Sequence, residues 1–373
     1  MEKKFNIKKI LNKKHFELAP SRLKCKFYAS KFFFFRQIQE IKSPCIYLCH
    51  KTNLFDKFLI SSFLHGNFVF LKDEVVQAVH NETLSQSEKK ELFEELQELK
   101  DNNFSVVVFP EKHFNVFGKS EKLSMEITNF LYETKLDIKF LYLIGTYQSF
   151  PIWAKAQRKC ETRALQQFKV EHEALTFLTK KGINTEINKF MPSSASVYDN
   201  KFPPRYNSNN LAVGLEQVFY CCPRCENLFS LYSEFNCIKC RECGSAIEFS
   251  RDGKILFSNK INSLDDIEDF LSNTIKKVHF KNDFVTNHPN VKFSSIQKNE
   301  KQKLIEIKIF VDKIELYDST LFKTIKFSDV KDVWLDFNNT IFVELETESF
   351  KISGTNNENF YIIIDLFKLF KSK

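Results

Sequence analysis

Apolar residues in the first half of the chain form short continuous runs, separated by segments with helical periodicity. The runs 45–49, 105–109 and 138–144 predict buried strands. Between the first two, residues 86–100 place Leu92, Phe93, Leu96 and Leu99 on one face, which predicts an amphipathic helix with Ser87 as a candidate cap. Buried strands that alternate with helices are typical of a parallel or mixed sheet covered on both faces. We therefore expect an α/β domain here.

Apolar and polar positions alternate in the last third of the chain, as in strands with one buried face. Seven strands are expected there, at 254–259, 304–310, 312–317, 323–327, 331–336, 340–346 and 349–353. The chain closes with a predicted helix that carries Phe360, Ile363, Ile364, Phe367 and Phe370 at helical spacing. This pattern predicts a small antiparallel β domain with a C-terminal helix.

Residues 192–212 are polar and contain Pro203-Pro204, which predicts a linker between the two patterns. With the cysteine cluster and basic N-terminus described below, we expect four parts: 1–40, 41–218, 219–250 and 251–373. The 373 residues are 43% apolar, and Gly and Pro together supply 17 positions. This composition fits a globular protein with two or three domains and excludes disordered and fibrous classes.

The basic surplus of the chain is local. Residues 1–40 hold nine Lys and two Arg against three Glu, a balance of +8 that equals the net charge of the whole sequence. Such a segment, with Phe5, Ile7, Ile10 and Leu11 among its lysines, predicts attachment to an anionic membrane surface, and a solvated basic tail is the alternative. We find neither an apolar run of ~20 residues nor a secretory signal, so we expect a cytoplasmic protein, peripheral on the inner face of the cell membrane.

Six of the ten cysteines lie between Cys221 and Cys243. Cys222-Pro223-Arg224-Cys225 and Cys240-Arg241-Glu242-Cys243 form two CxxC motifs separated by 14 residues, and Gly244 follows the second. Four thiolates at this spacing are typical of a tetrahedral zinc ribbon. Cys221 and Cys237 are alternative ligands, and a redox CxxC is the alternative chemistry, although it does not explain why the motif occurs twice.

A zinc ion bound by four thiolates has no open position for a substrate, so we expect Zn²⁺ to be structural. Zinc ribbons also occur in proteins that bind nucleic acids. Phosphate binding needs clustered Lys and Arg, and neither the ribbon nor the β domain after it is basic, so we expect no nucleic-acid partner.

Three blocks in the first half of the chain carry candidate chemistry. They are Cys49-His50-Lys51-Thr52-Asn53-Leu54-Phe55-Asp56, Phe109-Pro110-Glu111-Lys112, and the apolar run from Phe140 through Pro151. Their order and spacing resemble the 1-acylglycerol-3-phosphate (lysophospholipid) acyltransferase family. Residues 211–225 resemble the junction to the ribbon in a bacterial subgroup that adds a zinc ribbon and a β-rich tail.

The resemblance implies a glycerolipid acyltransferase-like mixed sheet with flanking helices, and acyl transfer from an acyl thioester to a lysophospholipid. The thioester would be carried by coenzyme A or acyl carrier protein. His50 would act as general base, with Asp56 as its orienting carboxylate. Glu111 would shape the acceptor pocket by hydrogen bonding. His50 and Glu111 both follow strands, at the edge where open α/β sheets form their crevices.

The sequence departs from the family pattern at the proposed site. Lys51 adds a residue between the histidine and the aspartate, so in a helical segment Asp56 would face away from His50 by roughly 100°. Lys112 and Phe114 stand where the family has Gly and Arg. The side chains of Lys72, Lys112, His113 and Lys119 are the candidates for supplying the missing positive charge to an acceptor phosphate.

The sequence supports three hypotheses for function. The first is an acyltransferase of phospholipid synthesis, and the second is a catalytically inactive relative that binds lipid or membrane. The third is an interaction protein built on the zinc ribbon. Separately, the β-rich domain faintly resembles a pleckstrin-homology or GRAM module. A hydrogen bond between His50 and Asp56 beside an apolar acyl tunnel would favour the enzyme.

Overall fold

The computed structural model describes residues 14–21, 25, 33–35, 39–40, 43–191, 193–195, 197, 201, 203–257, 261–296 and 302–372. Most of the basic segment 1–40 therefore lies outside the described residues, and its role at a membrane stays a prediction. Within the described ranges, no helix combines the length and apolarity that crossing a membrane requires.

The chain divides into two compact units. Unit 1 comprises residues up to Ser149 together with Lys159–Tyr206, and unit 2 comprises Phe150–Arg158 together with Asn207–Lys373. The boundary at Tyr206 lies inside the predicted linker 192–212. That stretch also contains the strand β10 (Tyr206–Asn207), and the fully buried Tyr206 side chain ties it to unit 1.

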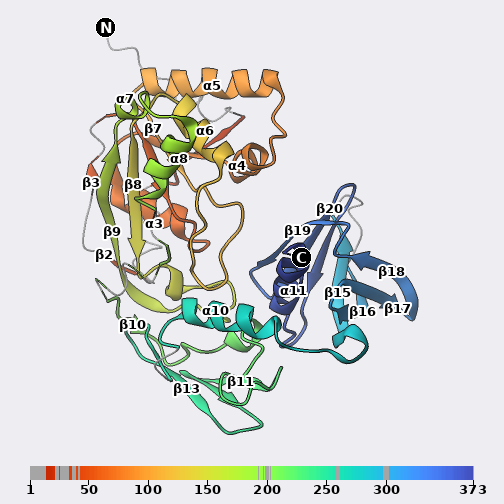
Figure 1. The fold of residues 1–373 in the computed structure, drawn as a ribbon. Helices are drawn as coiled ribbons and strands as arrows, with labels where there is room; N and C mark the ends of the chain where they lie inside the picture. The colour runs from red at the N-terminus through yellow and green to blue at the C-terminus, as the bar shows by residue number, and fades with distance from the viewer. Residues whose placement is uncertain are drawn as a thin grey trace. The chain divides into compact units, whose positions relative to one another are not determined.

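Unit 1 is an α/β unit built on a mixed sheet (Figure 1). Its strands, in order across the sheet, are β1 (Phe16–Leu18), β6 (Phe68–Leu71), β7 (Ser105–Val108), β4 (Ile46–Cys49), β8 (Ile138–Ile144), β9 (Lys159–Val170) and β10, and β2 (Phe33–Phe35) also pairs with β9. Strands β6, β7, β4 and β8 are mutually parallel, whereas β1 and β9 are antiparallel to their neighbours. A short parallel pair joins β3 (Gln39–Glu40) to β5 (Leu64–His65). The predicted mixed sheet is confirmed.

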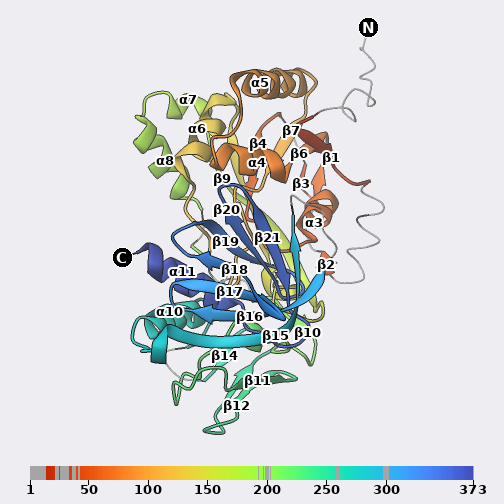
Figure 2. The ribbon, with the colours of Figure 1, turned by 90° about the vertical axis from the view of Figure 1, so that its right-hand side faces the viewer.

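Helices cover both sides of this sheet (Figure 2). On one face, apolar strand residues such as Ile46, Val106 and Ile138 share a core cluster with one set of helices, namely α4 (Asp73–His80), α5 (Gln86–Asp101), α6 (Met125–Glu133), α7 (His172–Leu175) and α8 (Lys180–Asn188). Helix α3 (Asp56–Phe63) lies on the other side. The predicted helix 86–100 is α5, but its cap is Ser85, whose side chain forms a capping box with Glu88.

Unit 2 begins with a small four-stranded sheet of β11 (Leu231–Glu234), β12 (Cys237–Cys240), β13 (Ala246–Phe249) and β14 (Ile255–Leu256). Helix α10 (Leu264–Ile275) follows. An antiparallel sheet then contains seven strands, namely β15 (Phe284–Ser295), β16 (Lys303–Phe310), β17 (Lys313–Asp318), β18 (Thr320–Lys326), β19 (Val330–Asp336), β20 (Thr340–Leu345) and β21 (Ser349–Ser353). Helix α11 (Tyr361–Lys371) ends the unit and buries Ile362, Ile363 and Leu366. The predicted antiparallel domain with a C-terminal helix is confirmed. The strand expected at 254–259 falls instead at the short β14, which pairs with β13 in the small sheet.

Candidate functional sites

Two parallel neighbours in unit 1 bring His50 and Glu111 together. His50 directly follows β4, and Glu111 follows β7 after the turn at Pro110. The two strands run in register, with Leu48 opposite Val108, so their carboxyl ends meet at one edge of the sheet. The expectation that both residues lie at this crevice edge is confirmed. Pro110 is itself held by His80, whose Nε2 lies 2.7 Å from the Pro110 carbonyl oxygen.

His50 and Glu111 form a hydrogen-bonded pair. Nδ1 of His50 bonds to Oε1 of Glu111, and the backbone N–H of Lys51 donates to Oε2 of Glu111 at 3.0 Å. The two side chains are 14% and 10% exposed. Nε2 of His50 is buried and has no hydrogen-bond partner among the described residues. The imidazole is thus anchored at one nitrogen, and the other is available to a reacting group.

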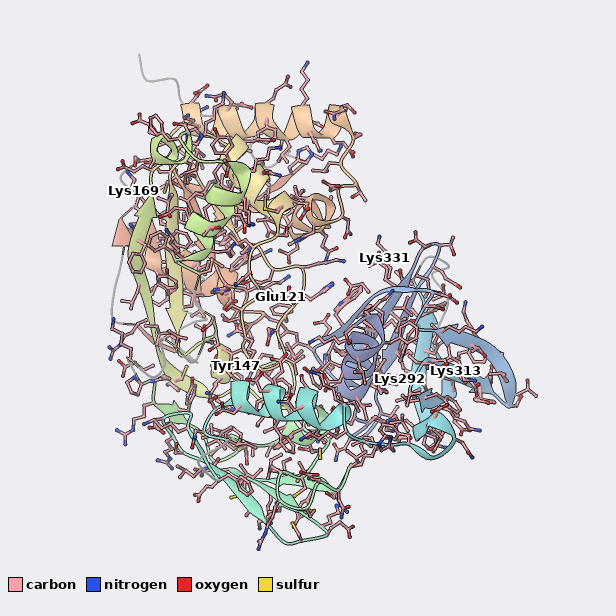
Figure 3. All side chains as sticks on the ribbon, viewed as in Figure 1. Glu121, Tyr147, Lys169, Lys292, Lys313 and Lys331 are labelled. Carbon is pink, nitrogen blue, oxygen red and sulfur yellow. The ribbon has the colours of Figure 1, made fainter. Side chains whose placement is uncertain are left out.

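A cavity opens beside this pair. It is lined by His50, Lys51, Thr52, Glu111, Asn115, Gly118, Lys119, Ser120, Tyr142, Leu143, Tyr147, Ser194 and Ala195, and encloses about 510 Å³ including its open mouth. Tyr147, labelled in Figure 3, comes after the carboxyl end of β8, and its hydroxyl donates to the Val116 carbonyl at 2.5 Å. Gly118 packs against the Tyr147 ring, where a Cβ atom would lie 2.8 Å from a ring carbon. All of the lining residues belong to unit 1, so the cavity lies within that unit.

Asp56 lies in a separate buried hydrogen-bond network. Its carboxylate accepts bonds from the Thr52 hydroxyl at 2.7 Å and the Asn53 N–H at 2.8 Å, and also from the Thr52 N–H. The side chain is 2% exposed, and burial raises the pKa of Asp56 to about 7 although these bonds lower it. Neither ring nitrogen of His50 bonds to Asp56. The predicted His50–Asp56 contact is absent, because Asp56 closes the turn that begins α3.

The predicted basic side chains separate in space. Lys119 lines the cavity, whereas Nζ of Lys72 donates to the Lys14 carbonyl at 2.6 Å. Lys112 and His113 continue the loop after Glu111 and are not among the residues that line the cavity. Lys51, which the resemblance implies is an insertion, also lines it. Among the other lining residues, Thr52, Tyr142, Leu143 and Tyr147 lie in the blocks that the sequence singled out, whereas Asn115, Ser120, Ser194 and Ala195 come from other parts of the chain.

Two neighbours hold the ammonium group of Lys51. Its ammonium group lies 3.1 Å from Oδ2 of Asp73 and 4.7 Å from the centre of the Phe114 ring. Burial raises the pKa of Asp73, but the neighbouring ammonium groups of Lys51 and Lys57 outweigh it, so this pKa lies below the usual value. An ionised Asp73 therefore holds the Lys51 ammonium group, while the backbone N–H of the same residue bonds to Glu111.

Unit 2 gathers the four predicted cysteines. The Sγ atoms of Cys222, Cys225, Cys240 and Cys243 all lie within 4.8 Å of one another. Two of these separations, Cys222 to Cys243 and Cys225 to Cys240, are 3.7 Å. A tetrahedron of thiolates around zinc with bonds of about 2.3 Å has sulfur–sulfur edges of about 3.8 Å, so this geometry fits zinc. Cys221 and Cys237 lie outside the group.

Serine hydroxyls support the sulfurs. Ser245 Oγ lies 3.2 Å from Cys243 Sγ and 3.4 Å from Cys222 Sγ, and Ser230 Oγ lies 3.3 Å from Cys240 Sγ. Hydroxyl donors of this kind orient thiolate ligands and lower their charge density. The four cysteines offer soft sulfur ligands from two CxxC turns, and this set suits a structural metal ion.

Comparisons with known proteins add little. No family model matches the sequence, and no curated protein matches it. Among solved structures, the chain is similar to the 1-acyl-sn-glycerophosphate (LPA) acyltransferase PlsC from Thermotoga maritima, with 16% identity and a TM-score of 0.36, over 48% of this chain and 79% of that one. It is also similar to the N-terminal PH domain of human ARAP2, with 16% identity and a TM-score of 0.21, over 26% and 85%. Both scores are low, so the function proposed below rests on the sites.

Proposed function

We propose that the protein is an acyltransferase that moves a fatty acyl group from an acyl thioester to the hydroxyl of a lysophospholipid such as 1-acylglycerol-3-phosphate. The observation that carries the proposal is the state of His50: Glu111 anchors one ring nitrogen, no described residue bonds to the buried Nε2, and the residue lines a cavity. An imidazole held in this way is suited to take a proton from a hydroxyl. The order of the sequence blocks around His50 and Glu111 supports the same chemistry.

In the proposed reaction, Nε2 of His50 accepts the hydroxyl proton as the lysophospholipid oxygen attacks the thioester carbonyl carbon. The carbon–sulfur bond then breaks, and the departing thiolate takes the proton from His50, which restores the neutral imidazole. Lys119, which lines the cavity, would attract the anionic part of the acceptor. The four cysteines would hold a structural Zn²⁺ in unit 2, and no step passes through it.

The test is a transfer assay with a labelled acyl thioester, on coenzyme A or acyl carrier protein, and a panel of lysophospholipids. His50→Ala should lower turnover by roughly 10² to 10⁴, because general-base assistance is lost, and should leave the fold intact. His172→Ala is the matched control, since His172 also has a buried, unpartnered Nε2 among the described residues but does not line the cavity. Equal inactivity of the wild-type protein and both variants across all donors and acceptors would instead favour a lipid-binding relative without catalysis.

A further inference from the structure

Glu111 and Asp56 are the two carboxylates considered as partners of His50, and they differ in their hydrogen bonds. Glu111 bonds directly to Nδ1 of His50. Asp56 is engaged by three donors from Thr52 and Asn53, all within its own turn. A carboxylate already satisfied in this way has little capacity left to orient an imidazole.

The extra residue Lys51 accounts for the difference. Its N–H donates to Oε2 of Glu111 while Oε1 meets His50, so both oxygens of Glu111 are fixed. The contact of Lys51 with Asp73 holds this part of the loop in place. The Lys51 amide and the His50–Glu111 bond therefore belong to one arrangement. In it, Glu111 takes the place of Asp56 as the carboxylate partner of His50.

We propose that Glu111, held by the Lys51 amide, is the positioning residue that orients His50, in place of Asp56. The inference rests on the proposed function. In this arrangement Nδ1 of His50 carries its proton toward Glu111, which leaves the lone pair on Nε2 of a residue that lines the cavity. When Nε2 takes the hydroxyl proton, the adjacent carboxylate of Glu111 offsets the new positive charge.

The first test measures His50 directly and needs no turnover. The protein is labelled with ¹⁵N-histidine, and the His50 signals are assigned by their loss in His50→Ala. We expect the wild-type ring to be protonated at Nδ1 when neutral. Glu111→Gln should weaken the preference for the Nδ1-protonated form, because both oxygens of Glu111 are used in the wild-type protein and the amide offers only one acceptor oxygen. Asp56→Asn should leave the tautomer unchanged. The reverse pattern would overturn the proposal.

The second test uses the pH dependence of transfer. Glu111→Gln should reduce kcat on the order of 10² to 10⁴ and move the acidic limb of the kcat–pH profile. Asp56→Asn should keep the position of that limb, and its main effect should be a lower melting temperature. A shift of the limb in Asp56→Asn, with none in Glu111→Gln, would contradict the assignment.

Lys51 supplies a matched pair of variants. Lys51→Ala keeps the backbone N–H that bonds to Glu111 and removes only the side-chain contact with Asp73, so His50 should keep the wild-type tautomer. Deletion of Lys51 restores the shorter spacing to Asp56 and disrupts the amide contact, so the Nδ1-protonated form should lose its preference and transfer should fall. Higher transfer after the deletion would show that Asp56 is the working partner. If the tautomers follow the expected pattern and no substrate turns over, the pairing stands and the acyltransferase proposal fails.

Discussion

Glu226 and Gly244 occupy the same position in the two CxxC turns, directly after the second cysteine. Both have left-handed backbones, with φ of 58° and 68°. Their N–H groups close equivalent turns, to the Cys222 carbonyl at 2.8 Å and to the Cys240 carbonyl at 3.1 Å. A side chain at such a φ costs roughly 1–2 kcal/mol, which glycine avoids. At this position the backbone of the second turn is thus unstrained, whereas the backbone of the first turn is strained.

Gly244→Ala should lower the free energy of unfolding of the metal-loaded protein by about 1 kcal/mol. No atom lies within 4 Å of the added Cβ, so the cost comes from backbone strain alone. Glu226→Gly is the converse variant and should be neutral or stabilising. Denaturant unfolding monitored in unit 2 measures both. Destabilisation by Glu226→Gly as large as that by Gly244→Ala would show that the Glu226 side chain matters more than its backbone.

At this scale the sequence singled out His50, Glu111 and the four cysteines as candidates, but it did not pair His50 with Glu111. The angle expected between His50 and Asp56 assumed a helical segment, whereas α3 begins only at Asp56 and the residues before it are not helical. The contact with Glu111 is different in kind, because it depends on β4 and β7 being parallel neighbours. Sequence separation carries no information about that adjacency.

Among the elements, three strands with continuous apolar runs, β4, β7 and β8, were predicted within one residue at either end. Strand β6 was missed although its four residues are all apolar. The long strands β9 and β15 were also missed. Each spans 12 residues with charged or amide side chains scattered through it, and β15 has a register shift between His288 and Val291 that breaks the two-residue period. Long strands of this kind are formed by pairing with their neighbours rather than by their own pattern.

Helix α11 carries a buried acid whose titration affects stability. Asp365 is 3% exposed and accepts a hydrogen bond from the Tyr220 hydroxyl at 2.7 Å. Burial raises the pKa of Asp365 to about 7, whereas in an unfolded chain it is ~3.9. Between these pH values the folded state keeps a proton that the unfolded state has released. This contribution to stability is therefore complete below pH ~4 and is lost as pH rises toward about 7.

Asp365→Asn should flatten this dependence. Denaturant unfolding at pH 5 and pH 8 should show a smaller loss of stability in the variant than in the wild-type protein, because the amide does not titrate. Asp56 in unit 1, whose pKa is also raised to about 7, contributes equally to both proteins, so the difference isolates Asp365. Parallel profiles for the two proteins would contradict a raised pKa at this site.

In the whole molecule, the metal site and α11 are connected through one residue. Tyr220 precedes the first CxxC turn, and its hydroxyl bonds to Asp365 on the helix. The structural metal should therefore stabilise more of unit 2 than the small sheet, which contains its ligand Cys240. Unit 1 has its own core and should not depend on it.

A Cys240→Ser and Cys243→Ser double variant should lose about one zinc per chain, and amide hydrogen exchange should accelerate in β11, β12 and α11 while unit 1 keeps its protection. Cys237→Ser is the control, since this cysteine lies outside the four-sulfur group. Metal analysis together with exchange mass spectrometry provides both readouts. Stoichiometric zinc in the double variant would rule out these ligands.

The route of the chain through the two units affects its synthesis on the ribosome. Trp153 and Arg158 belong to unit 2, and the Arg158 side chain bonds to the Leu211 carbonyl, 53 residues later. At roughly 5–20 residues per second, the ribosome needs about 3 to 10 s to make the intervening chain, which is the remainder of unit 1. During that interval residues 150–158 are already part of the nascent chain, whereas the later part of unit 2 has not been made. Residues 150–158 therefore complete their packing only after Leu211 has been made, and a pause in translation between 159 and 206 would delay that step.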